Sequence, residues 1–260
     1  MQAAARVLAS GAMGAFLLLV AAAPSILLLA YFYLRDRFER EPLGHLTLAY
    51  LLGMYAMVAA QGLSTAAAGL VAPQWLAERG EGALLFDAFF LAGLIEEFSK
   101  WVILMAAVYH WSEVDESLDG LIYGVAIALG FATLENLLYL QRLGLGVAWP
   151  RAVFAVPAHA LFGGAMGFYA GRAKFDHDAP GVSPGTRRRR LLGDHLCCLL
   201  VPTLFHGTYD FALMHGLDWK AWSAVTGISI GLWAFVLHRV TRAQRASPYR
   251  PKTMPPARHR

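Results

Sequence analysis

The chain has 260 residues, of which 57% are hydrophobic and only 15% are charged, and its formal net charge is +4. Soluble domains carry about 25% charged residues, so this composition excludes a soluble globular domain and predicts an integral membrane protein. The positive charge does not indicate a nucleic-acid partner, because the basic residues lie mainly in two connections and the tail, where membrane topology accounts for them.

Seven apolar stretches are long enough to cross a bilayer core of about 30 Å. In chain order they cover residues 13–34, 43–71, 84–109, 119–141, 150–172, 191–214 and 220–239. An eighth segment within the long second stretch is the alternative. We predict an all-α polytopic membrane bundle, with residues 1–246 as a single domain. The Pro- and Arg-rich tail, residues 247–260, is too polar to join a packed core and is predicted to be disordered.

The distribution of Lys and Arg predicts the orientation of the chain. One side of the membrane receives 16 of them, in the segments 35–42 and 172–190 and in the tail from residue 239, whereas the other side receives five. Because cytoplasmic connections are enriched in basic residues, we expect the C-terminus and the tetra-arginine segment 187–190 in the cytoplasm. This indicates a multi-pass protein of the inner cell membrane with its N-terminus outside.

Charged and histidine side chains lie inside the predicted spans, where each charge costs about 2.5–3.5 kcal/mol on insertion scales. A cluster of them consists of Glu96, Glu97, Lys100, Glu135, His159, His206 and Asp210. Such groups must face one another or a water-filled cavity, so the sequence predicts that they converge.

Helical spacing and depth support this convergence. Lys100 follows Glu96 by four residues, and Asp210 follows His206 by four, so each pair shares one helix face. At about 1.5 Å per residue, the polar groups of these spans fall between the midplane and the outer third of the bilayer. Carboxylates and imidazoles at one depth suit the activation of water for hydrolysis.

Short motifs then resemble those of the PrsW family of intramembrane proteases. Glu-Glu-Phe-Ser-Lys at 96–100 matches its EExxK motif, the segment 131–135 matches FxxxE, and the segment 206–210 matches HxxxD. His159 lies in a further His-containing element, and the charged segment 33–42 resembles the one that follows the first helix of the family. The resemblance covers residues from about 25 to 240, with the motifs in the expected order.

The resemblance implies proteolysis in or beside the membrane. The substrate is expected to be a membrane protein with a single span, such as an anti-sigma factor cut near its extracytoplasmic side, and the surrounding partner is the lipid bilayer. Similarity to the wider superfamily of CAAX endopeptidases leaves prenyl-protein processing as an alternative. It also leaves open whether a divalent metal such as zinc takes part, or a glutamate works without one.

The roles that follow for the individual residues are those of a hydrolytic site. Glu96 is expected to act as the general base, assisted by Glu97, while Lys100 compensates their charge. His159 and His206 either bind a metal together with Glu135 or stabilise the oxyanion, in which case Glu135 positions water. Asp210 is expected to orient His206, and Asn136 to support the site beside Glu135.

Two further functions were weighed against proteolysis. Chains of acids and histidines in spans also occur in transporters and proton relays, but the chain shows neither inverted repeats nor glycine-interrupted helix pairs. A non-catalytic scaffold would be favoured had Glu96, Glu135 or His206 been replaced, and none is.

Overall fold

The computed structural model describes residues 2–70, 80–176, 183–216 and 218–251, with side chains from residue 11 onward. Within these ranges the chain forms helices and no strand, which confirms the predicted helical membrane bundle. The longer helices are α1 (Gln2–Arg35), α2 (Leu43–Leu70), α5 (Ile95–Ala106), α6 (Ser117–Leu143), α8 (Val156–Phe175), α9 (Pro184–His215) and α10 (Trp219–Ala246). The short segments are α4 (Glu81–Leu85), η1 (Phe86–Leu94), η2 (Val108–His110), η3 (Leu145–Val147), α7 (Ala148–Pro150) and η4 (Arg151–Ala155).

Six helical segments in the described ranges are long and apolar enough to cross a membrane, and they correspond to six of the seven predicted stretches. The stretch predicted at 84–109 is also helical but is built differently. It consists of α4, the π-helical segment η1 and α5 in direct succession, and it carries Glu96, Glu97 and Lys100. A π-helical segment is uncommon and is found most often near functional sites.

Helix α9 begins earlier than the sequence suggested. The connection predicted to extend from 173 to 190 ends at Ser183, and the tetra-arginine segment lies in the beginning of the helix. Pro184 occupies the first turn, and the Ser183 hydroxyl accepts a hydrogen bond from the Thr186 amide at 3.3 Å. A serine cap followed by proline in the first turn is a typical helix start.

The predicted tail lies only partly within the described ranges. Residues 252–260 fall outside them, but the first residues of the tail contact the bundle. The Tyr249 hydroxyl donates a hydrogen bond to Asp115 Oδ2 at 2.6 Å. The start of the tail thus packs beside the beginning of α6.

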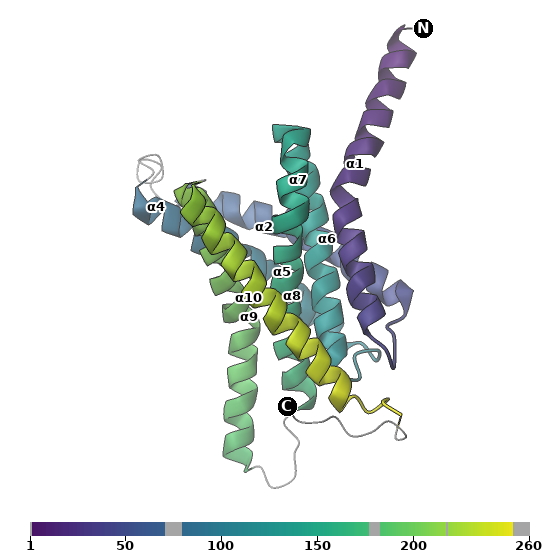
Figure 1. The fold of residues 1–260 in the computed structure, drawn as a ribbon, viewed down its shortest axis with the longest axis vertical. Coiled ribbons are helices and arrows are strands. Elements are labelled where there is room, and N and C mark those ends of the chain that lie inside the picture. Colours follow the sequence, from purple (N-terminus) through teal and green to yellow (C-terminus); the bar gives the residue numbers. More distant parts are fainter. Residues whose placement is uncertain (1, 71–79, 177–182, 217, 252–260) are drawn as a thin grey trace.

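The interior of the bundle is formed by α6 and α8, which run side by side through its middle (Figure 1). Nearly every residue of α6 from Leu118 to Thr133 is buried. A β-carbon at Gly167 would overlap the backbone carbonyl of Gly120, and one at Gly124 would overlap that of Gly163. Glycine at these positions therefore lets the two backbones touch, as small residues do between membrane helices.

The outer helices present apolar side chains to the surroundings. Leu19 and Leu27 of α1, Tyr55 of α2, and Ile230 of α10 are each more than half exposed. Contiguous exposed apolar surface on several helices is expected where lipid replaces water. The polar residues of the site, by contrast, are collected at the centre, where α5, α6, α8 and α9 meet.

Candidate active site

The residues predicted for the site come from four helical elements and surround one cavity of about 310 Å³. Four of the residues that line the cavity come from different helices. Glu96 lies on α5, Glu135 on α6, His159 on α8 and His206 on α9. Glu97 does not line the cavity. It lies fully buried behind the cavity, whereas Glu96, Glu135, His159 and His206 line it.

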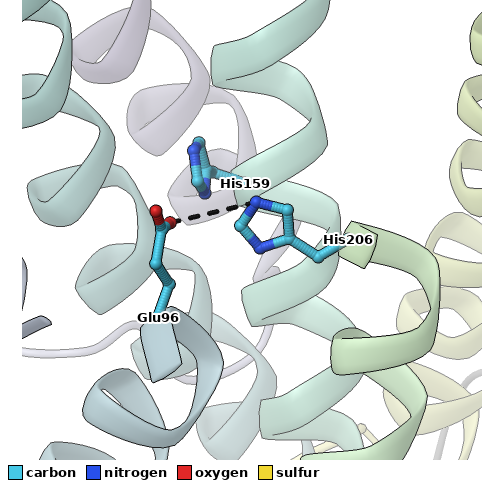
Figure 2. Close-up of side chains that lie close together, drawn as sticks. All are labelled: Glu96, His159 and His206. Carbon is cyan, nitrogen blue, oxygen red and sulfur yellow. Dashed lines mark ion pairs between the residues drawn. The ribbon is translucent and has the colours of Figure 1, made fainter. Parts of the chain in front are cut away.

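Glu96 lies where η1 gives way to α5, and its carboxylate points toward the two imidazoles (Figure 2). Its Oε2 is 3.9 Å from His206 Nε2 and 4.0 Å from Lys100 Nζ. This oxygen is buried and has no hydrogen-bond partner among the described residues. A close approach of η1 to α9 brings the two sides together, since a β-carbon at Gly93 would lie 3.0 Å from the Thr203 carbonyl oxygen. Glu96 thus presents an unsatisfied carboxylate oxygen to the cavity.

Glu97 links a buried cation to one of the histidines. Its Oε1 accepts hydrogen bonds from Lys100 Nζ at 2.7 Å and from His206 Nδ1 at 2.8 Å. Lys100 is fully buried and its ammonium also lies 4.0 Å from the centre of the Phe131 ring. This geometry agrees with charge compensation by Lys100 and gives Glu97 a second contact that the sequence did not predict.

The two histidines are held in different ways. Lys100 Nζ lies 3.0 Å from His159 Nδ1, and Glu135 Oε2 lies 3.0 Å from His159 Nε2. Because an ammonium only donates, His159 Nδ1 must accept and Nε2–H must donate to Glu135. His206 uses Nδ1 toward Glu97, which leaves its Nε2 facing the cavity, 3.3 Å from Asp210 Oδ2. Asp210 thus contacts His206 as predicted, although Glu97 makes the shorter bond.

A possible ligand set for a metal differs in one member from the set expected from the sequence. Glu96, His159 and His206 each offer a ligand atom, and these atoms lie within 4.8 Å of one another. Glu135, the expected third ligand, instead forms an ion pair with Arg151 at 2.5 Å. One carboxylate with two imidazoles is a ligand set that zinc accepts in catalytic sites.

The surroundings of these three residues fit such an ion. Glu96 Oε2 has no hydrogen-bond partner within the described part of the chain. Glu97 supports the rear nitrogen of His206, as carboxylates commonly do for metal-bound histidines. Both nitrogens of His159 are engaged, so ligation by this ring would require it to give up Lys100 or Glu135.

Arg151 was counted from the sequence only as a basic residue of an outer connection. In the structure its guanidinium contacts Glu135 and Asn136, each at 2.5 Å, and covers the Tyr139 ring at 4.0 Å. Asn136 is buried, and its amide donates to the Ala21 carbonyl at 3.4 Å, which joins α6 to α1. Asn136 thus holds Arg151 beside Glu135.

A second cavity, of about 230 Å³, reaches Glu96 from the side of α2 and η1. Both cavities are lined by Ala92, Glu96 and Met214. The walls of the second cavity are mainly apolar, with Gln61, Ser64 and Asp87 added. Glu96 is therefore the acidic residue at which the two spaces meet.

Comparisons with a family profile and with individual known proteins point to the same family. The profile of the PrsW family intramembrane metalloprotease matches residues 41–240. Protease PrsW of Bacillus subtilis (strain 168) is 36% identical over 224 residues, which is 85% of this chain and 93% of the relative. Protease PrsW of Geobacillus kaustophilus (strain HTA426) is 35% identical over 238 residues, covering 91% of this chain and 95% of the relative.

A more distant relative shows the same extent of similarity. Protease PrsW of Clostridioides difficile (strain 630) is 33% identical over 230 residues, covering 87% of this chain and 90% of the relative. No solved structure matches the chain. The family profile spans all the residues that surround the cavity, and the relatives align over most of their length. The chain therefore belongs to the PrsW family of intramembrane proteases.

Proposed function

We propose that this protein hydrolyses a peptide bond of a membrane protein near the extracytoplasmic side of the bilayer, using a water molecule activated by Glu96. The observation that carries the proposal is the unsatisfied Glu96 carboxylate oxygen in a cavity that also holds two imidazoles. A general base must lie within hydrogen-bond reach of the water whose proton it takes. Glu96 meets that requirement at the junction of two cavities.

The reaction can be written with the side chains of this site. Glu96 accepts a proton from water while the water oxygen bonds to the scissile carbonyl carbon, and the carbonyl oxygen becomes an oxyanion. His206 donates from Nδ1 to Glu97, so it acts as an imidazolium, and its Nε2–H, which faces Glu96 across the cavity, donates to that oxyanion. The C–N bond then breaks, and Glu96 returns the proton to the departing amine nitrogen.

Glu97 and Lys100 act from behind the cavity. The Glu97 carboxylate holds His206 Nδ1 and thereby fixes the direction of the ring. Lys100 balances the negative charge of Glu97 and also holds His159. A divalent ion bound by Glu96, His159 and His206 would supply Lewis-acid polarisation of the carbonyl and a lower pKa for bound water.

The expected depth of the cut in the membrane follows from the helix ends that lie close to the cavity. Tyr139, Arg151 and Met214 line it, close to where α6 ends, η4 begins and α9 ends. The count of basic residues assigns these connections to the outside. We therefore propose a single-span substrate, such as an anti-sigma factor, cut toward its extracytoplasmic end, and a cytoplasmic C-terminus for the protease.

The test is cleavage of a single-span substrate in vesicles that contain the purified protein. Glu96→Gln should lower turnover by a factor of about 10² or more, whereas Glu81→Gln, an exposed acid of α4, should leave it unchanged. Full activity of Glu96→Gln would contradict the proposal and favour a proton relay.

Chelation separates the two forms of the mechanism. If a metal takes part, chelators should abolish cleavage and zinc should restore it, and His206→Ala should lose both metal and activity. If Glu96 works without one, activity should survive the chelator, and His206→Ala should retain a residual rate about 10²–10³ lower.

A further inference from the structure

A second group of acidic side chains lies far from the candidate active site, at the start of α6. Glu39 and Glu41, in the connection between α1 and α2, meet Asp119, in the first turn of α6. One carboxylate oxygen of each lies within 4.8 Å of those of the other two. We call these residues the three-carboxylate cluster. Asp119 precedes Glu135 by 16 residues of one helix, which places the two groups about 24 Å apart along α6.

The cluster is buried and its charge is not balanced by a neighbour. Glu41 is 1% exposed and Asp119 is 0% exposed. Both carboxylate oxygens of Glu41, and Oδ1 of Asp119, have no hydrogen-bond partner among the described residues. No basic side chain within those residues forms an ion pair with any of the three. Burying unpaired carboxylates is unfavourable, so the cluster must hold either a proton or a cation.

Asp119 is held in place by the backbone at the start of its helix. Its Oδ2 accepts hydrogen bonds from the amides of Glu116 at 2.6 Å and Asp115 at 2.8 Å. Glu116 in turn caps the helix, and the two residues form a reciprocal capping box. One Asp119 oxygen is therefore fixed by the capping box while the other stays available.

A neutral oxygen from outside the acidic set also faces the cluster. Tyr123, one turn after Asp119, is fully buried, and its hydroxyl lies beside the Glu41 carboxyl. The neighbouring cation, Lys174, interacts with Asp119 through its charge but forms no ion pair with it among the described residues. Its Nζ donates to the carbonyls of Tyr109 at 2.7 Å and Val114 at 2.8 Å.

The electrostatic consequence is visible at Glu41, which lies outside the membrane-spanning helices. Burial, together with the charges of Asp119 and Glu39, raises the pKa of the Glu41 carboxyl to about 9. Where no cation is bound, the Glu41 carboxyl therefore holds a proton, and a divalent cation that displaces this proton would supply the missing positive charge. Hard divalent cations prefer oxygen ligands of this type.

We propose that Glu39, Glu41 and Asp119 bind one hard divalent cation, Mg²⁺ or Ca²⁺, which fastens the α1–α2 connection to the beginning of α6. Glu39 is half-buried and completes the ligand set from the solvent side, leaving positions for water. The site is structural and does not depend on the proposed hydrolytic function.

The proposal is tested by thermal unfolding of the purified full-length protein in detergent. The Glu96→Gln variant is used as the background, so that binding at the Glu/His cavity does not contribute. After removal of metals with a chelator, Mg²⁺ or Ca²⁺ added at millimolar concentration should raise Tm by about 5 °C or more. The arm with the larger shift identifies the preferred ion, and calorimetric titration should give one ion per chain.

A matched pair of variants connects the shift to the cluster. Glu41→Gln replaces a carboxyl that holds a proton in the absence of metal with a neutral amide of the same shape. In chelator it should therefore unfold at about the same temperature as the parent, yet gain nothing from either cation. Glu113→Gln, a neighbouring acid that faces His45, should keep the full shift. If Glu41→Gln does not fold, the same measurement is made on Glu39→Gln, at the half-buried position, which should also lose the Tm shift. A cluster that is merely protonated would show no shift with either ion, and that result, or an undiminished shift in the variants, overturns the proposal.

Discussion

Glu97 illustrates how a single side chain serves both the stability of the bundle and the geometry of the site. It forms a buried ion pair with Lys100 and a hydrogen bond with His206. Removing one member of a buried pair leaves an unpaired charge and costs about 3–5 kcal/mol, whereas replacing both with uncharged groups is often tolerated.

The variants Glu97→Gln and Lys100→Met should therefore each lower Tm in detergent, and the double variant should recover much of the loss. Activity should not recover with stability, because His206 loses its charged support, which is worth about 10–100-fold at comparable sites. Unfolding curves and cleavage rates of the three variants check this. Recovery of full activity in the double variant would show that Glu97 only neutralises Lys100.

Arg151 allows a second prediction at this scale. It pairs with Glu135 and holds Asn136 at the mouth of the cavity. Arg151→Ala should lower kcat/KM by about tenfold or more, since it leaves Glu135 free to turn away from His159. Arg142→Ala is the control, because Arg142 lies exposed at the end of α6. Equal rates for the two variants would place Arg151 outside the site.

The individual site residues could be predicted from the sequence to different degrees. Glu96, His159 and His206 were found because charged and histidine residues inside apolar spans require partners. Arg151 was not found, since a basic residue in an outer connection is ordinary, and its contact depends on how η4 turns into α8. The position of Glu97 behind the cavity also depends on helix rotation, which the spacing alone does not fix.

At the scale of elements, the contact between α6 and α8 is the feature that sets the distance between Glu135 and His159. Gly167→Ala would place a β-carbon on the backbone of Gly120, so the helices must separate. Overpacking of this kind costs about 1–3 kcal/mol. We expect a lower Tm together with a loss of activity.

The control for this change lies on α10. A β-carbon at Gly231 would meet no atom within 4 Å, so Gly231→Ala should leave activity unchanged and Tm equal or slightly higher. Melting curves and cleavage rates measured on the two variants distinguish helix separation from a general effect of alanine. Unchanged activity in Gly167→Ala would contradict the proposed role of this contact.

The helices were predicted well where a long apolar stretch of sequence indicated them. The helices that match the six long apolar stretches agree with the sequence to within a few residues at most ends. The π-helical segment η1 was not predicted, because nothing in the residue pattern of Phe86–Leu94 distinguishes a π-helical from an α-helical turn. It alters the rotation of everything that follows, which includes Glu96 and Glu97.

At the scale of the whole molecule, the orientation in the membrane is a prediction that decides the side of cleavage. Single cysteines introduced in a background lacking Cys197 and Cys198 should be labelled from outside at residues 143–149, and only after permeabilisation at 187–190. The 16-to-5 distribution of basic residues is the physical reason. The reverse pattern would move the proposed cut to the cytoplasmic side.

The backbone contact between α6 and α8 has one more consequence, which concerns how a substrate could enter. Two helices that touch without intervening side chains have no room to slide or rotate, so Glu135 and His159 form a stationary half of the site. Glu96 belongs to the other half, which follows η1 and borders the second, mainly apolar cavity beside α2. If an extended segment reaches Glu96 through this second cavity, we therefore expect α2 and η1 to move while α6 and α8 stay in place.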